Sequence, residues 1–363
     1  MTSTAPRFAF LALGEAHQLF HILGPAAALA RNGHDVTFLV SSVWHERIVA
    51  QYAPHSGLTI ERLRTLPQRD ASISATPSRL STLVLNAHRF AGFEVLVTPE
   101  RSSTLLKRLG LFRGKLAHIP HGAGDREAGY DPRIRYFDLV FVAGEKDRRR
   151  MIARGLVRED ACIVAGYAKF DLIKDPPPRF FDNDNPVVLY NPHFDARLSS
   201  WPAMGPDLVS AFEMEESCNF IVAPHIRMRG TLRESFDALA ARNTKTHIRF
   251  DSGSLHSVNM DYTRSAALYL GDVSSQVYEF IRTPKPCVFL NPRGVAWRND
   301  EHYAHWHFGP VATTVGEAMS LMRSGLNAPG DFTSAQREGL REAIVQSSAT
   351  ASEEIAAVLS NVR

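Results

Sequence analysis

The segment from Ser265 to Pro292 restricts the possible folds of this chain most strongly, because it predicts two buried strands joined by a helix. Ala266–Leu270 is an apolar run of strand length that ends at Gly271, and Cys287–Leu290 is a second such run. Between them, Val277, Phe280 and Ile281 recur at the spacing of one buried helix face. A strand–helix–strand unit of this kind is typical of parallel α/β sheets.

The same unit recurs along the chain. Phe8–Leu13 and Val36–Val40 are predicted strands on either side of a helix that ends near Arg31, and Val187–Tyr190 and Phe220–Ala223 form a similar pair in the second half. Each predicted strand runs into a polar loop, and in parallel sheets such loops gather at one edge, where ligands bind. The first unit has no G-x-G-x-x-G sequence, which argues against a dinucleotide cofactor.

Length and composition favour two domains. A chain of 363 residues exceeds one ordinary domain, and 44% hydrophobic residues provide enough apolar surface for two cores. Three consecutive prolines and a polar run mark the boundary, so we predict an N-terminal domain over residues 1–174, a linker over 175–186 and a C-terminal domain over 187–363. We expect the final helix to pack back onto the N-terminal domain.

The net charge and the spacing of the cysteines indicate which binding partners and which cellular compartment to expect. A net charge of +3 is too small to indicate nucleic-acid binding, although it suits an anionic substrate. The three cysteines are far apart and have no metal-ligand spacing, which favours a reducing compartment. No signal-peptide core or 20-residue apolar run occurs, so we expect a cytoplasmic protein. The arginine-rich stretch 146–150 predicts a solvated helix face, with contact to the inner membrane face as the alternative.

Histidines follow several predicted strands in the first half. His17 and His21 lie just after the first strand, and His121 follows another beside Gly122, which would let a ligand approach the backbone. For His17 and His21, catalysis and an ordinary polar position at a helix start are about equally supported. His302, His305 and His307 fit no common zinc-ligand spacing, so we predict no metal site.

The loop after Gly271 is the candidate anion site of the second half. Asp272, Ser274 and Ser275 stand at a predicted helix start, where backbone amides without helical partners and serine hydroxyls favour a diphosphate. The alternative is that one serine only caps the helix. His225, after another strand, is a further candidate.

With these motifs placed, the chain resembles the GT-B glycosyltransferases, and more narrowly the CDP-glycerol glycerophosphotransferases that polymerise teichoic acids and capsules. The resemblance covers about residues 118–325 and implies two facing Rossmann-like domains with a cleft between them. Six short motifs resemble motifs of the glycerophosphotransferase family and follow one another in the same order. They are His121-Gly122, Gly166–Asp171, Leu189–Pro192, Pro224-His225, Gly271–Ser275 and Lys285-Pro286. Gly271 and Val273 depart from its Ser-Asp-Tyr-Ser-Ser loop, and the residues after His121-Gly122 lack its Thr-Pro.

The resemblance implies an inverting, metal-independent and cofactor-independent transferase. It would move a glycosyl or glycerophosphate group from a CDP- or UDP-linked donor to a hydroxyl of a surface polysaccharide, teichoic-like polymer or glycolipid precursor. His121 is the implied base, and His17 is the alternative. The implied acceptor contacts are Gly122, Asp125 and His21, and the implied donor contacts are Gly271, Asp272, Ser274, Ser275, Glu279 and His225.

Two other functions remain open. A UDP-sugar 2-epimerase of the same fold would use carboxylates, of which Glu15, Asp125 and Asp272 stand at predicted strand ends. A non-catalytic nucleotide-sugar binding protein would keep Ser274 and Ser275 but would gain nothing from His121.

Overall fold

The computed structural model describes residues 6–67, 73, 75–126, 129–173, 176–328 and 330–362. The chain divides into two compact units. The first contains residues 1–123, 127–173 and 341–363, and the second contains residues 124–126 and 174–340. The predicted linker begins at residue 175, outside the described residues, and residues 176–186 form neither helix nor strand.

The described residues of the first unit form a seven-stranded parallel sheet with the strand order β3-β2-β1-β4-β5-β6-β7. Its interior strand β1 is buried at every position, which explains its uninterrupted apolar sequence. The strands are β1 Phe8–Ala12, β2 Val36–Val40, β3 Thr59–Arg62, β4 Val95–Thr98, β5 Lys115–His118, β6 Leu139–Val142 and β7 Cys162–Val164.

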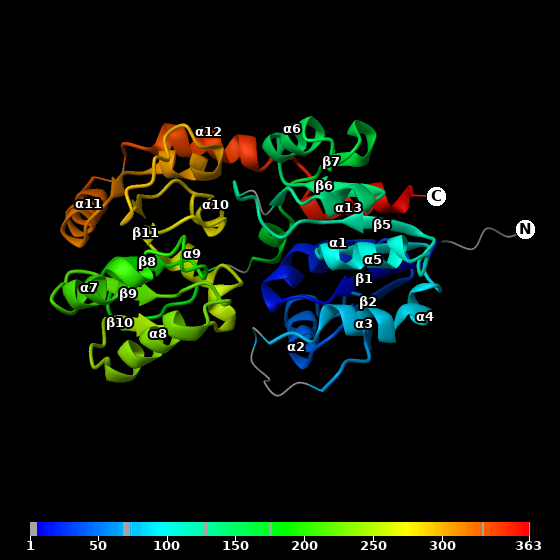
Figure 1. Ribbon diagram of the computed structural model, residues 1–363, viewed down its shortest axis with the longest axis horizontal. Coiled ribbons are helices and arrows are strands. Elements are labelled where there is room, and N and C mark those ends of the chain that lie inside the picture. The colour runs from blue at the N-terminus through cyan, green and yellow to red at the C-terminus, as the bar shows by residue number, and fades with distance from the viewer. Residues whose placement is uncertain are drawn as a thin grey trace, which may run out of the picture. The chain divides into compact units, whose positions relative to one another are not determined.

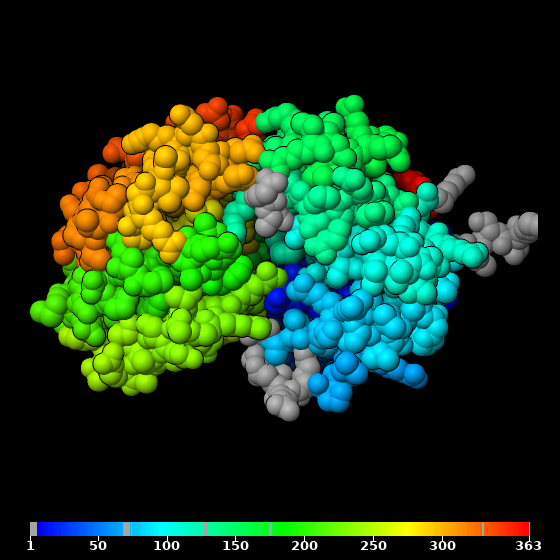
Figure 2. All heavy atoms as spheres, in the orientation of Figure 1, coloured from blue at the N-terminus to red at the C-terminus, as the bar shows by residue number. Residues whose placement is uncertain are grey.

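Helices cover this sheet (Figure 1). They are α1 Leu19–Arg31, α2 Val43–Tyr52, α3 Arg79–Leu85, α4 Ala87–Phe90, α5 Thr104–Arg108, α6 Glu145–Ala153 and α13 Ala351–Ser360. The C-terminal helix α13 packs against α1, and in Figure 2 the C-terminal residues, in red, lie among the atoms of the first unit.

The described residues of the second unit form a six-stranded parallel sheet with the order β10-β9-β8-β11-β12-β13. Its strands are β8 Val187–Asn191, β9 Asn219–Val222, β10 Ile248–Phe250, β11 Leu268–Gly271, β12 Cys287–Leu290 and β13 Val311–Ala312. The helices are α7 Trp201–Glu213, α8 Gly230–Arg242, α9 Asp261–Ser265, α10 Gln276–Phe280, α11 Val315–Asn327 and α12 Thr333–Ala343, and α12 crosses the boundary between the units.

One face of the second sheet carries its main core. Apolar residues of β8, β9, β11 and β12 pack there against α7, α8 and α11, around the buried side chains of Trp201 and Phe212. On the other face, Tyr269 of β11 packs against Phe280 of α10. The predicted α/β architecture and the strand–helix–strand unit at residues 265–292 are therefore confirmed.

The C-terminal region contains two helices. The sequence pattern of Ser334–Leu359 is helical, and the structure divides it into α12 and α13, which are separated by residues 344–350. Val345 donates its amide to the carbonyl of Ala143, and Thr350 forms a capping box with Glu353 at the start of α13. The helical pattern is interrupted because a second helix begins at this capping box. The Thr-x-x-Glu sequence at residues 350–353 indicates this helix start in the sequence.

Candidate functional site

The strand order of each sheet indicates where a ligand would bind. In both sheets the chain extends to one side of the first strand and then returns to the other side, between β1 and β4 in the first unit and between β8 and β11 in the second. Ligands of open parallel sheets bind at such switch points, at the carboxyl ends of the strands. The loops after β1, β4, β8 and β11 are therefore the places to look for functional side chains.

Two buried glutamates stand at the switch point of the first sheet. Glu15 follows β1, and Glu100 follows β4. Arg79, at the start of α3, bridges them: its Nη2 lies 2.8 Å from Glu15 Oε2 and its Nη1 lies 3.1 Å from Glu100 Oε2. The Arg79 side chain keeps 30% of its exposure, against 9% and 6% for the two carboxylates. Two buried carboxylates thus share one guanidinium at the sheet edge.

Two histidines lie at the same edge. His17, in the short 3-10 helix Ala16–Gln18, and His121, after β5, are both half-buried, and their ring centroids are 5.3 Å apart in an edge-to-face arrangement. Gly122 has φ +130°, a backbone conformation that requires glycine. The sequence prediction placed these two histidines as alternatives, and the structure brings them together.

His21 lies deeper in the first unit. It is buried within α1 and packs edge-on against Tyr167. Burial, followed by the nearby charges of Lys169 and His121, lowers its pKa well below the ordinary value, so the ring is neutral. Its predicted contact with an acceptor stays a prediction, and we do not include it among the proposed catalytic groups.

Asp272 organises the switch point of the second sheet. Its Oδ2 accepts hydrogen bonds from the backbone amides of His193 at 2.8 Å and Ser200 at 2.9 Å, and so joins the loop after β11 to the loop after β8. Ser200 is also the residue that precedes α7. Burial raises the pKa of Asp272 to about 6, although these amides favour the charged carboxylate. Asp272 thus joins the two loops through backbone hydrogen bonds, and its predicted contact with the donor stays a prediction.

The raised pKa of Asp272 predicts a pH-dependent stability. A carboxyl group whose pKa is raised on folding contributes stability that is complete below about pH 4 and is lost as the pH rises through 6. Asparagine offers an oxygen to the same amides without this titration. We expect the unfolding free energy of Asp272→Asn, minus that of wild type, to increase by up to about 3 kcal/mol between pH 4 and pH 7. Urea unfolding at several pH values, with the exposed Asp237→Asn as control, measures this difference, and a constant difference would contradict the prediction.

The serine loop has a more local structure than the sequence predicts. Ser274 Oγ accepts from the amide of Gln276 at 3.2 Å, which is a local turn just before the N-cap residue of α10. Ser275 makes no side-chain cap, and the Cα of Ser275 lies within 3.4 Å of the position where a Cβ on Gly124 would be. The helix α10 has only five residues, which leaves a small dipole for a bound anion. Diphosphate binding by these serines stays a prediction.

The remaining predicted donor residues are distributed around the same sheet. Gly271 ends β11 and is buried against the ring of Tyr269. Glu279 is buried in α10 and lines a small cavity together with Leu189, His256 and Tyr262. His225 follows β9, and its Nδ1 accepts from the amide of Arg227 at 3.2 Å. The contact of Glu279 with a ribose stays a prediction, and so does the contact of His225 with phosphate.

Asp125 belongs to the second unit and has a structural environment. It is 1% exposed, and its carboxylate accepts from the hydroxyl of Tyr278 at 2.8 Å and from Nδ1 of His305 at 2.9 Å. The backbone amide of His305 also donates to this carboxylate, at 3.3 Å. Nδ1 of His302 lies 3.0 Å from the backbone carbonyl oxygen of Asp125. Its predicted contact with an acceptor therefore loses its physical basis, since the carboxylate is already occupied by internal donors.

Sequence reasoning missed Glu100, Arg79 and Arg126 as site residues. Glu100 follows a strand by two residues, which was a usable signal. Arg79 lies 21 residues before Glu100 in a segment without a motif, so only the fold reveals their proximity. Arg126 comes from the segment 124–126, which the structure assigns to the second unit although it lies far outside residues 187–363.

The described residues form neither a metal-binding group nor a membrane-spanning helix. Among the residues that the structure describes, no group of three His, Cys, Asp or Glu side chains has an arrangement that holds a metal ion. None of the described helices is both long enough and apolar enough to cross a membrane.

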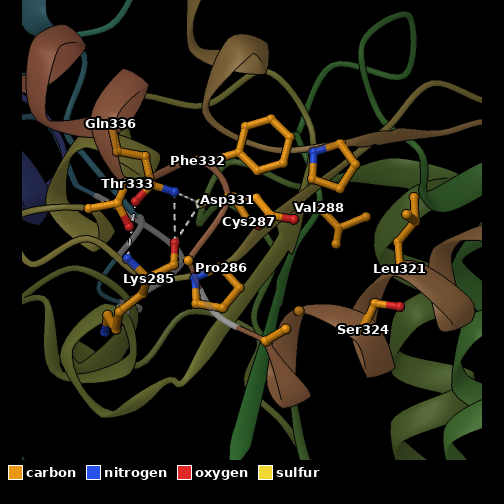
Figure 3. Close-up of a pocket in the computed structure, with 14 residues that line it drawn as sticks. Lys285, Pro286, Cys287, Val288, Leu321, Ser324, Asp331, Phe332, Thr333 and Gln336 are labelled. Atoms are coloured by element: carbon orange, nitrogen blue, oxygen red, sulfur yellow. Dashed lines mark hydrogen bonds between the residues drawn. The ribbon is translucent and has the colours of Figure 1, made fainter.

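The cavity in Figure 3 lies away from these loops. It has a volume of about 210 Å³ and opens between the start of β12 and the helices α11 and α12, with Pro286, Leu321 and Phe332 on its apolar walls. Gln336 closes one side through hydrogen bonds to the backbone of Lys285. Because Lys285 and Pro286 precede β12, the cavity is at the amino end of this strand, opposite the candidate site.

The sequence matches no family model and no curated protein sequence. Solved structures do resemble the whole chain, which has the GT-B fold of two parallel α/β units. A UDP-GlcNAc 2-epimerase from Methanocaldococcus jannaschii, solved with UDP-GlcNAc and UDP, matches with a TM-score of 0.67 and 12% identity over 97% of this chain and 99% of the other.

Two more structures show the breadth of this likeness. The UDP-GlcNAc 2-epimerase from Neisseria meningitidis matches with a TM-score of 0.58 and 10% identity, over 97% of this chain and 98% of that one. A sucrose-phosphate synthase from Thermosynechococcus elongatus matches with a TM-score of 0.55 and 14% identity, over 98% of this chain and 97% of the other. Identities this low establish the fold, and the reaction has to be argued from the residues.

Proposed function

We propose that the protein is an enzyme acting on a nucleoside-diphosphate sugar, and that its reaction is epimerisation at the carbon next to the anomeric carbon. In this proposal the second unit holds the diphosphate and the first unit supplies acid and base groups. The single observation that carries the choice of reaction is the buried Glu15–Arg79–Glu100 cluster at the switch point of the first sheet.

The chemistry explains why carboxylates matter. Inverting a carbon centre that bears hydrogen requires a proton to leave one face and a proton to return on the other. Positioned carboxyl groups commonly perform such transfers, and each contributes about 10²–10⁴-fold to the rate. Both carboxylates lie within ion-pair distance of the Arg79 guanidinium, and the partial exposure of Arg79 lets it exchange partners when a substrate binds.

The comparisons support the substrate class. Structures with this fold include epimerases solved with UDP-GlcNAc, and UDP-GlcNAc is therefore the first substrate to test. The predicted absence of a metal or cofactor is part of the proposal, because the first-unit cluster supplies acid–base groups and the basic side chains of the second unit supply positive charge for the diphosphate.

A test of this function uses the complete protein with UDP-GlcNAc in D₂O and without any acceptor. We expect deuterium to enter at the epimerised carbon and the 2-epimer to accumulate, as observed by proton NMR, and we expect EDTA to change neither rate. Absence of both exchange and epimer over prolonged incubation would overturn the proposal. Loss of activity in EDTA and its recovery with a divalent ion would overturn the metal-independent part alone.

One observation favours a second candidate function, an inverting transferase. The neighbouring rings of His17 and His121 are suited to removing a proton from an acceptor hydroxyl, which a neutral histidine does well near pH 7. In this case a glycosyl or glycerophosphate group would pass from a CDP- or UDP-linked donor to a surface polysaccharide or glycolipid precursor, and peripheral contact with the inner membrane face would belong to the same proposal. Such an enzyme would release nucleotide only when an acceptor is added, and it would incorporate no deuterium.

A further inference from the structure

The contacts of His193 in the second unit place two hydrogen-bond donor groups against each other. The amide of Asp195 donates to Nδ1 of His193 at 2.9 Å, while Nη1 of Arg126 lies 2.6 Å from its Nε2. A neutral imidazole has one acceptor nitrogen and one N–H donor, and a guanidinium has donors only. If Nδ1 accepts from Asp195, then Nε2 carries the proton, and two donor groups face each other.

The unfavourable contact of the two is the one between Arg126 Nη1 and His193 Nε2. The Asp195 amide is two residues from His193 in the chain, so its contact is set by the local turn. Burial, followed by the charge of Arg126, lowers the pKa of His193 to about 4, so a charged ring does not relieve the conflict near neutral pH. An anion that accepts from both Nε2–H and the guanidinium would relieve it.

Arg126 also lacks an anionic partner. Within the part of the chain that the structure describes, no carboxylate forms an ion pair with Arg126. The nearest acidic group acting on it, Asp195, is engaged with Arg197, whose Nη2 lies 2.8 Å from Asp195 Oδ2. The other carboxylate of this edge, Asp272, accepts from backbone amides through Oδ2. A half-buried arginine that has no counterion among the described residues and lies beside a buried histidine is a typical anion-binding arrangement.

The position of Arg126 is fixed by its neighbour in the chain. Asp125 is anchored to Tyr278 and His305, so the next residue is held at the switch point between β8 and β11. Open parallel sheets bind phosphate-bearing ligands at this point. A Cβ on Gly124 would lie 2.9 Å from the Cβ of Ser275, which shows that the segment 124–126 packs closely on the serine loop.

We propose that Arg126 and His193 together bind a phosphate group of the nucleoside diphosphate, with the guanidinium and the Nε2–H both donating to phosphate oxygens. The inference rests on the proposed function for the identity of the complete ligand, but the phosphate site is a property of the second unit alone. Arg126 is then a specificity residue for diphosphate, supplied by a segment that lies 61 residues before β8 in the sequence.

Calorimetric titration of the complete protein with inorganic pyrophosphate, and separately with UDP, tests the site. We expect Arg126→Gln to weaken both ligands by about tenfold or more, because a charge-assisted hydrogen bond is lost. Arg126→Lys should recover part of the affinity. The matched control is Arg323→Gln, which removes an equal charge from an exposed arginine of the second unit that is paired with Glu215, and it should change either affinity by less than about threefold.

Several outcomes would overturn the site. They are a wild-type protein that does not bind pyrophosphate, an Arg126→Gln variant that binds as well as wild type, or equal losses in the Arg126 and Arg323 variants. Circular dichroism confirms that each variant is folded, and Arg126→Lys carries the test if Arg126→Gln is not. Failure of the proposed reaction is distinguishable, because pyrophosphate binding that depends on Arg126 would persist in a protein that does not epimerise UDP-GlcNAc.

Discussion

Glutamine in place of Glu15 or of Glu100 is expected to lower the rate of epimerisation and of deuterium exchange by about 10²–10⁴-fold. Glutamine has the shape of glutamate and still accepts hydrogen bonds from Arg79, but it cannot take up a proton from the substrate. Both positions lie in the first unit, so the affinity for UDP, which we assign to the second unit, should change by less than about threefold. Proton NMR of UDP-GlcNAc in D₂O and calorimetry with UDP measure the two effects.

A matched control separates catalysis from the loss of an ion pair. Glu46 and Arg62 also form a glutamate–arginine pair in the first unit, with Arg62 Nε donating to Glu46 Oε1 at 2.7 Å, but both side chains are exposed. Glu46→Gln should leave both rates near those of wild type. If Glu15→Gln and Glu100→Gln keep full activity while His17→Ala or His121→Ala abolishes it, the base is a histidine and the transferase candidate gains support.

Most of the fold could be predicted from the sequence because parallel strands are buried on both faces. Phe8–Leu13 and Val187–Tyr190 are continuous apolar runs for this reason, and the structure confirms both as interior strands. Helix ends were harder to predict, because they depend on single capping residues such as Thr350. The predicted domain limits failed to include the segment 124–126 in the second unit, since composition carries no information on where a short loop packs.

The candidate site was only partly predictable. Residues that follow a strand directly, such as Glu15 and Asp272, were found because the parallel sheet places them at one edge. Residues that reach the edge from elsewhere, such as Arg79 and Arg126, had no local signal. Asp125 shows the opposite error, because a polar residue in a glycine-rich loop resembles a ligand contact until its internal partners are known.

Removal of the Asp125 carboxylate is expected to have the largest effect on stability. In Asp125→Ala, the hydroxyl of Tyr278 and Nδ1 of His305 would be left buried without their acceptor. Each buried donor left without an acceptor costs about 1–3 kcal/mol, so the two together should lower the free energy of unfolding by about 2–6 kcal/mol. Tryptophan fluorescence during urea unfolding reports this loss selectively, because Trp201, Trp297 and Trp306 belong to the second unit and Trp44 alone to the first.

Two milder variants show whether this effect arises from the hydrogen bonds. Asp125→Asn keeps one acceptor oxygen, and Tyr278→Phe removes only the hydroxyl, so each should cost about 1–2 kcal/mol. Because Asp125 holds the next residue beside His193, Asp125→Ala should also weaken pyrophosphate binding under conditions where the protein remains folded, whereas Tyr278→Phe should weaken it less. If Asp125→Ala unfolds at the same urea concentration as wild type but loses activity with an acceptor substrate, then Asp125 contacts the acceptor, and its hydrogen bonds to Tyr278 and His305 do not stabilise the second unit.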